Sequence, residues 1–295
     1  MTGDSETAPI AAPGTARAPG RMAWTAAPPR ATHGARRRRF GAARRPKTPA
    51  RIMALIDLAN PTRFLALSGR LLPWLAGATA VLLAAGLAMA WTAPDDYQQG
   101  ATVKIMFIHV PFAWLAMFVW AVMSLSALGT LVWRHPLADV AAKAAAPLGA
   151  GFTLLCLVTG SLWGRPMWGA YWVWDARLTS VLVLFIMYCG VMALWRAIDD
   201  PSRAARAAAV LTLVGAVNLP IIKFSVDWWS TLHQPASVLR VGGPTIDPSL
   251  LWPLLVMALA LTLLFVTLHL AAMRNEILRR RVRTLQLMRA VAQGA

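Results

Sequence analysis

Charged residues and cysteine are scarce in this sequence. Only 14% of its 295 residues are charged and 58% are hydrophobic, which is far from the composition of a soluble globular domain. The two cysteines, Cys156 and Cys189, form no C-x-x-C pair, which excludes a thiol-redox motif and a zinc site built on paired cysteines. Glycine-rich phosphate loops and nucleophile elbows are also missing, which argues against an ATPase or a hydrolase.

Six long apolar stretches fill most of the chain. Most of them reach the roughly 18–20 residues that a helix needs to cross about 30 Å of hydrocarbon, and the period-two alternation of barrel strands is absent. Because backbone polar groups in lipid must be satisfied within the segment, we expect helices. The sequence therefore predicts an all-α integral membrane protein with six transmembrane helices. The predicted spans are approximately 71–91, 110–133, 144–163, 178–195, 207–222 and 250–272.

The distribution of positive charge predicts the orientation of these helices. The formal net charge is +17, and thirteen of the 29 Lys and Arg residues precede the first span, whereas six arginines follow the last one. Alternate links are richer in Lys and Arg, and such links mark the cytoplasmic side. We therefore expect both termini in the cytoplasm and attribute the charge to membrane lipid, with no nucleic-acid partner. The loops expected to face outward lie at about 92–109, 163–177 and 223–249.

Composition divides the chain into three segments. Residues 1–52 are rich in Ala, Pro, Gly and Arg without the apolar core of a signal peptide, so they are expected to form a disordered basic extension. An alternative is that translation starts at Met53. Residues 53–273 would form the six-helix membrane domain, and 274–295 a basic cytoplasmic tail.

Two of the five histidines are expected on the outer side of the membrane. His109 stands at the outer entrance of the second span, and His233 lies in the third outer loop, where Trp228 or Trp229 would join it on one face of a short surface helix. A lone interfacial histidine is usually a hydrogen-bonded bystander, but two on one side favour a binding site. Imidazole pairs suit haem iron as axial ligands, and tryptophan faces suit the porphyrin. The other histidines are His33, His135 and His269.

The stretch "WGAYWVWD", residues 168–175, makes the second outer loop unusually aromatic. With Trp163, it places four of the fourteen tryptophans within twelve residues, more than the one or two aromatics per helix end that anchor a membrane protein. The glycines and proline of "WGRPMWG" favour a shaped hairpin against the membrane. Asp175 is expected to N-cap the fourth helix, and Arg165 and Arg177 are cations able to pair with carboxylates. The tryptophans assigned to the site are Trp163, Trp168, Trp172 and Trp174.

These residues carry a specific resemblance. "TGSLWGRPMWGAYWVWDARLTS" (159–180) resembles the WWD signature of the haem-handling proteins of cytochrome c maturation, and most closely that of the C-component family, CcmC. The resemblance runs from about Met53 to the end of the sixth span, and His109 and His233 fall on the family's haem-ligand positions. Four further segments match in order: "DYQQG" (96–100), "HVP" (109–111), "NLPIIKFSVDWWSTLHQ" (218–234) and "IDP" (246–248).

The resemblance implies a haem-delivery protein of the bacterial inner membrane rather than an enzyme. It would bind haem b non-covalently at the periplasmic surface, with the two histidines on separate flexible loops as iron ligands. It would present the haem to a haem chaperone, the E component. A small one-span D subunit and an ABC-type pair, A and B, would complete the assembly.

Three alternatives remain from the sequence. A haem-lyase-like subunit shares the tryptophan signature, but is usually larger, with more spans and histidines. A b-type cytochrome that passes electrons to quinone would place histidine pairs deep inside helices, where the spans offer only His269. A solute permease would have charged or broken helices at the midplane, for which Asn218 with Pro220 is the only candidate.

Overall fold

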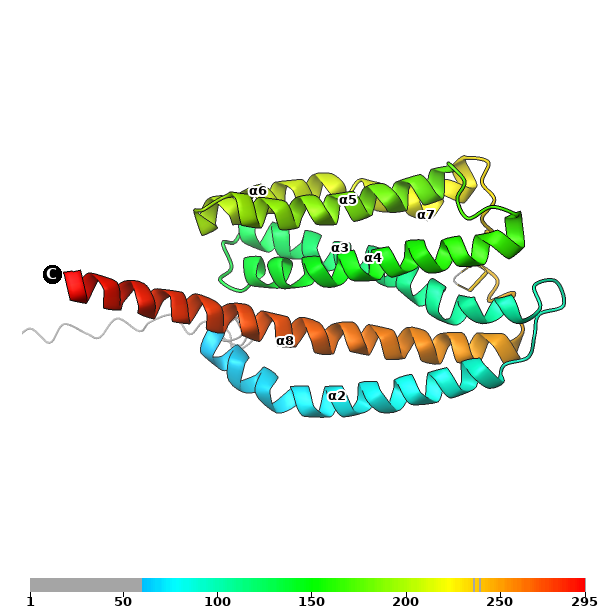
Figure 1. Ribbon diagram of the computed structural model, residues 1–295, viewed down its shortest axis with the longest axis horizontal. Helices are drawn as coiled ribbons and strands as arrows, with labels where there is room; N and C mark the ends of the chain where they lie inside the picture. Colours follow the sequence, from blue (N-terminus) through cyan, green and yellow to red (C-terminus); the bar gives the residue numbers. More distant parts are fainter. Residues whose placement is uncertain (1–59, 236, 239, 295) are drawn as a thin grey trace, which may run out of the picture. The chain divides into compact units, whose positions relative to one another are not determined.

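The computed structural model describes residues 60–235, 237–238 and 240–294 and is entirely helical apart from its connections and one isolated bridge. Six helical segments are long and apolar enough to cross a membrane, as the sequence predicts. The proposed extension 1–52 and the alternative start at Met53 lie outside the described residues. The helices are α2 (Pro61–Thr92), η1 (Ala101–Ile105) leading into α3 (Met106–Leu131), α4 (Ala138–Trp168), α5 (Ala176–Ala197), α6 (Pro201–Gly215), α7 (Asn218–Trp228) and α8 (Pro248–Gly294) (Figure 1).

The fifth span differs from its prediction because it consists of two helices. α6 ends at Gly215 and α7 begins at Asn218, so the predicted continuous helix over 207–222 is interrupted. Pro220 accounts for the break, since it lacks an N–H and its ring clashes with the carbonyl four residues earlier. The Asn218 side chain donates to the Ser180 carbonyl at 2.8 Å, which ties the start of α7 to α5.

The centre of the bundle is built on α3. Its Trp120 and the Tyr188 ring of α5 are fully buried and meet edge to face, with ring centroids 4.7 Å apart. The indole of Trp120 donates to the Thr212 carbonyl at 3.0 Å, and the Tyr188 hydroxyl donates to the Ala116 carbonyl at 2.9 Å. These two donors satisfy buried backbone carbonyls and connect α3 to α5 and α6.

α2 packs along α8 at one side of the bundle (Figure 1). The hydroxyls of Thr79 and Thr267 lie 3.2 Å apart midway along the pair, and Arg274 donates to the Leu65 carbonyl. Gly86 permits the close approach, because a Cβ at this position would lie 2.6 Å from the sulfur of Met257. Small residues and interhelical hydroxyls are the usual means of helix association in lipid.

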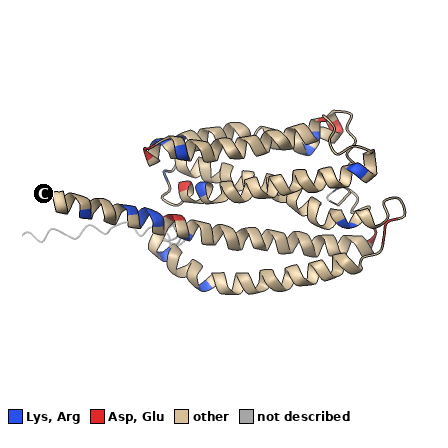
Figure 2. Ribbon diagram, in the orientation of Figure 1, with Lys and Arg blue, Asp and Glu red and all other residues tan. Residues whose placement is uncertain are grey.

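Charged residues lie mostly toward the two ends of the helices (Figure 2). At one end, called here the arginine-rich end, Glu276 of α8 is buried and accepts from Lys143 of α4 at 2.8 Å and from Arg280 at 2.9 Å. Arg280 also pairs with Asp139 at 2.7 Å. The three loops that the sequence predicts to share one side gather at the opposite end, called here the loop end (Figure 1).

Gly149 of α4 provides a test of the central packing. A Cβ on Gly149 would overlap the Tyr188 ring, whose hydroxyl bond to α3 prevents it from moving aside. We expect Gly149→Ala to lower the stability of the purified protein in detergent by about 1–3 kcal/mol, the usual cost of overpacking. Thermal unfolding followed by tryptophan fluorescence measures the change.

Gly151 is the matched control, because a Cβ there meets nothing within 4 Å and the position is exposed. Gly151→Ala should leave the unfolding temperature unchanged or raise it slightly through helix propensity. Equal unfolding temperatures for the two variants would contradict the assigned packing of α4 on α5.

Candidate functional site

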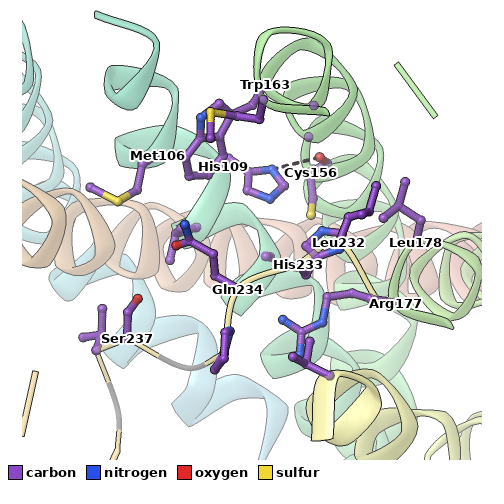
Figure 3. A pocket seen from close by; sticks show the side chains of 18 of the residues that line it. Met106, His109, Cys156, Trp163, Arg177, Leu178, Leu232, His233, Gln234 and Ser237 are labelled. Atoms are coloured by element: carbon purple, nitrogen blue, oxygen red, sulfur yellow. Dashed lines mark hydrogen bonds between the residues drawn. The ribbon is translucent and has the colours of Figure 1, made fainter. Parts of the chain in front are cut away.

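A large cavity opens among the loops at the loop end and descends between the helices. Its volume is about 820 Å³, within the range of ligand pockets, and its lining is mostly apolar. It reaches residues well below the loops, including Cys156, Leu184 and Leu254. Trp168 follows Cys156 by 12 residues on α4, a rise of about 18 Å, so the cavity penetrates the bundle. Both His109 and His233 line it (Figure 3).

His109 lies in the first turns of α3 and is held by α4. Its Nδ1 lies 3.1 Å from the Cys156 carbonyl and 3.1 Å from the Thr159 hydroxyl oxygen. Since a carbonyl only accepts, and the Thr159 hydroxyl donates to Leu155 at 2.7 Å, Nδ1 must carry the proton. Gly160 leaves room for the ring, because a Cβ there would lie 2.8 Å from His109 Cε1.

His233 lies on the irregular segment between α7 and α8 and is held by the start of α5. Its Nδ1 lies 3.2 Å from Oδ2 of Asp175, while Oδ1 of the same carboxylate accepts from the Leu178 N–H at 2.7 Å. Burial lowers the pKa of His233 below its ordinary value, whereas Asp175 acts to raise it. The Asp175 side chain is 6% exposed, so little water competes for this contact.

The two histidines therefore share one chemical arrangement. In each ring Nδ1 faces an acceptor, a backbone carbonyl for His109 and a carboxylate for His233, which places the proton on Nδ1. In the neutral ring this leaves the lone pair on Nε2. Histidines that bind a metal through Nε2 usually donate Nδ1–H to such an acceptor, which fixes the ring and raises its basicity.

Tryptophans support both rings. Trp163 meets His109 edge to face at 5.7 Å between centroids, and Trp168 meets His233 in the same way at 4.9 Å. Gln99, from the "DYQQG" segment, accepts from the Trp163 indole at 3.0 Å. Trp172 also lines the cavity, and its buried indole N–H finds no acceptor within the described part of the chain. A ligand with an acceptor oxygen would satisfy this donor.

The predicted site residues divide into two groups. Five of them do not line the cavity. Asp175 acts through His233, and Arg165 donates to the Gly169 carbonyl and faces the Tyr171 ring at 5.6 Å. The other three, all exposed, are Trp174, Trp228 and Trp229. The predicted residues that line the cavity are His109, Trp163, Trp168, Trp172, Arg177 and His233.

Of the two predicted cations, only Arg177 belongs to the cavity. Its Nε donates to the Ser225 hydroxyl at 3.0 Å and its Nη2 to the Lys223 carbonyl at 3.2 Å. Arg177 therefore joins the start of α5 to α7, and Lys223 lines the same cavity. Both side chains place positive charge where a ligand's carboxylates would be favourable.

Three local predictions were wrong. "WGRPMWG" is no hairpin, because α4 continues through Pro166 to Trp168 and ends where Gly169 adopts φ 74°. "DWWSTLHQ" forms no surface helix, since α7 ends at Trp228 and the backbone then extends. The two histidines do not both lie on loops, as His109 is part of α3. The Asp175 cap of α5 is confirmed.

Sequence reasoning missed the residues that hold the histidines. Thr159 and Gly160 lie within the quoted tryptophan-rich signature, but they were given no role, and Gln99 was noted only as part of a matching segment. The spacing of Gly160 and Gly164 was an available signal, since small residues four apart mark a close approach on a helix. Here Gly160 admits the His109 ring, and a Cβ on Gly164 would lie 3.1 Å from the Trp168 ring.

Comparison with known proteins agrees with this geometry. The family model described as "Heme exporter protein C" matches residues 54–288. A heme exporter protein C of Bradyrhizobium diazoefficiens is 81% identical over 238 residues, covering 81% of this chain and 90% of the relative. Those of Escherichia coli K12 and Paracoccus denitrificans are 49% and 44% identical, covering 76% and 79% of this chain and 91% and 97% of the relatives. The chain belongs to the heme exporter protein C family.

Proposed function

We propose that the chain binds haem b non-covalently between His109 and His233 and delivers it to a haem chaperone during cytochrome c biogenesis. One observation carries this proposal: both histidines line a single cavity, each with Nδ1 engaged and Nε2 left for iron. Two axial imidazoles are a common ligand set for haem iron. The names of the relatives support haem export as the wider process.

The rest of the cavity suits the remainder of a haem molecule. The edges and faces of Trp163, Trp168 and Trp172 provide aromatic contact for a flat porphyrin. Arg177 and Lys223 are cations able to pair with the two propionates, and the buried Trp172 N–H is a further donor. These groups would ligate the iron, stack on the porphyrin and neutralise the propionates. Such contacts suit a protein that carries haem rather than an enzyme that transforms it.

The two histidines are held by different kinds of structure, and this difference favours a carrier that releases its haem. His109 is part of a helix and is packed against α4, whereas His233 lies on an irregular segment between α7 and α8. Movement of that segment would open the cavity at the loop end and free one ligand. We propose that the E-component chaperone takes haem there, in an assembly with the one-span D subunit and the ABC-type A and B subunits.

The charge distribution supports a definite orientation in the bacterial inner membrane. Arginines outnumber acids beyond the buried Glu276 of α8, and positive charge favours the cytoplasmic side. We therefore propose that the arginine-rich end faces the cytoplasm and that the loop end, with the cavity, faces the periplasm.

Replacing either histidine tests the ligand assignment. In His109→Gly or His233→Gly, titrated with ferric haem b in detergent, the iron loses one nitrogen ligand but the aromatic contacts remain. We expect weaker binding and a shifted Soret band in each variant, and loss of most haem in the double variant. Added imidazole should restore much of the original spectrum, because it supplies the same donor.

His135→Gly and His269→Gly are the controls, since neither residue lines the cavity. His135 lies in the link between α3 and α4, and His269 stacks on Phe265 inside α8. Both variants should keep the original spectrum. A normal spectrum in either His109→Gly or His233→Gly would remove that residue from the ligand set.

Orientation is testable with a matched pair of cysteines in a Cys189→Ala background. Ser230 is exposed and follows the end of α7, which lies at the loop end, and Ser202 is exposed in the first turn of α6, which begins at the arginine-rich end (Figure 1). We expect a membrane-impermeant maleimide to label Ser230→Cys in intact spheroplasts and Ser202→Cys only after permeabilisation. The reverse pattern would place the cavity on the cytoplasmic side.

A further inference from the structure

The Asp175 carboxylate makes two contacts with its two oxygens. Oδ1 accepts from the Leu178 N–H at 2.7 Å and caps α5, while Oδ2 lies 3.2 Å from His233 Nδ1. The capped helix begins within the tryptophan-rich signature, and His233 lies 58 positions after Asp175 in the chain. A single side chain therefore fixes both the start of a helix and the orientation of a distant imidazole.

The second contact decides which nitrogen of His233 carries the proton. A carboxylate only accepts, so the Nδ1 atom facing it must be the donor, and in the neutral ring Nε2 then keeps its lone pair. With a donor group in place of Oδ2, the proton would move to Nε2, which then offers no lone pair to a metal. The partner at Nδ1 thus controls whether His233 can act as a ligand.

We propose that Asp175 is a positioning residue that holds His233 in the Nδ1–H form, with Nε2 ready to bind haem iron; this rests on the function proposed above. Asp175 acts through His233 and does not line the cavity itself. The negative charge of Asp175 also raises the basicity of His233 Nε2, the nitrogen that would bind iron. The partners of His109 are neutral, so they raise the basicity of its Nε2 less.

Asparagine cannot replace Asp175, although it caps helices as well as aspartate does. Its side chain has one oxygen and one NH₂ group, whereas both existing contacts require an acceptor. If the oxygen caps Leu178, the NH₂ group faces His233 Nδ1 and favours the wrong proton position. If the oxygen faces His233, the cap is lost.

Asp200 provides a matched control within the same chain. It N-caps α6 by accepting from the Arg203 N–H at 2.7 Å, and the same carboxylate oxygen accepts from the Ser202 hydroxyl at 2.8 Å. It is exposed and contacts no histidine in the described residues. Asp200→Asn therefore changes a cap of the same kind without changing a ligand.

The first measurement uses the full-length protein without haem. With ¹⁵N-labelled histidine, the His233 signal, assigned by its absence in His233→Gly, reports which ring nitrogen is protonated. We expect Nδ1–H in the original protein and in Asp200→Asn, and a shift to Nε2–H in Asp175→Asn. An unchanged Nδ1–H form in Asp175→Asn would overturn the proposal.

The second measurement titrates ferric haem b into the same proteins. Loss of a partner beyond the ligand typically weakens metal binding roughly 10- to 100-fold, and we expect this for Asp175→Asn together with a Soret shift that imidazole reverses. Asp175→Ser keeps a capping oxygen but is too short to reach His233, so it should bind haem weakly while unfolding at the original temperature. Original affinity in both variants would overturn the proposal.

The two proposals fail in different ways. If His233→Gly keeps the original haem spectrum, His233 is no ligand and the proposed function fails at that residue. If His233→Gly loses the spectrum while Asp175→Asn and Asp175→Ser keep it, the ligand assignment stands and the role of Asp175 is wrong.

Discussion

The close approach of α3 to α4 is the contact on which the rest of the site depends. Near the start of α4, a Cβ on Gly129 of α3 would lie 3.1 Å from the Cβ of Ala138, so the two helices pack tightly there. Further along α4, Gly160 leaves space for the His109 ring beside the Cys156 carbonyl. In lipid, helix association relies on such packing and on a few polar contacts, because the surrounding tails are as apolar as the side chains.

The site joins three segments that are distant in the chain and differ in secondary structure. His109 belongs to a helix, the Trp163–Trp168 region is the last part of another helix, and His233 belongs to an irregular segment. Each polar atom that fixes a ring comes from a different element from the ring itself. The geometry of the cavity is therefore a property of the folded bundle, and local unfolding of any one segment would change it.

Two residues, Asp175 and Arg177, connect the start of α5 to the segments that carry the rest of the cavity. Asp175 joins α5 to the segment that carries His233, and Arg177 joins α5 to α7 through Ser225 and Lys223. The start of α5 is thus connected both to α7 and to the irregular segment that follows α7. A displacement of α7 relative to α5 would act on both connections.

The sequence by itself determined the features that depend on composition and on local chemistry. Apolar length fixed the six spans, alternation of the spans placed the three loops at one end, and the Asp175 cap followed from a residue preference at helix starts. The positions of His109, His233 and three tryptophans near the loop ends of the spans also follow from the sequence, and all five residues line the same cavity.

Only the tertiary structure decided which partner each group meets. The broken fifth span, the continuation of α4 through Pro166, and the contacts of His109 with Thr159 and of His233 with Asp175 all depend on neighbouring elements. Local patterns carry period and propensity, but they carry no information about which surface a helix faces across the bundle. The proton positions on the two histidines are set by those neighbours, so they could not be derived until the helices were packed.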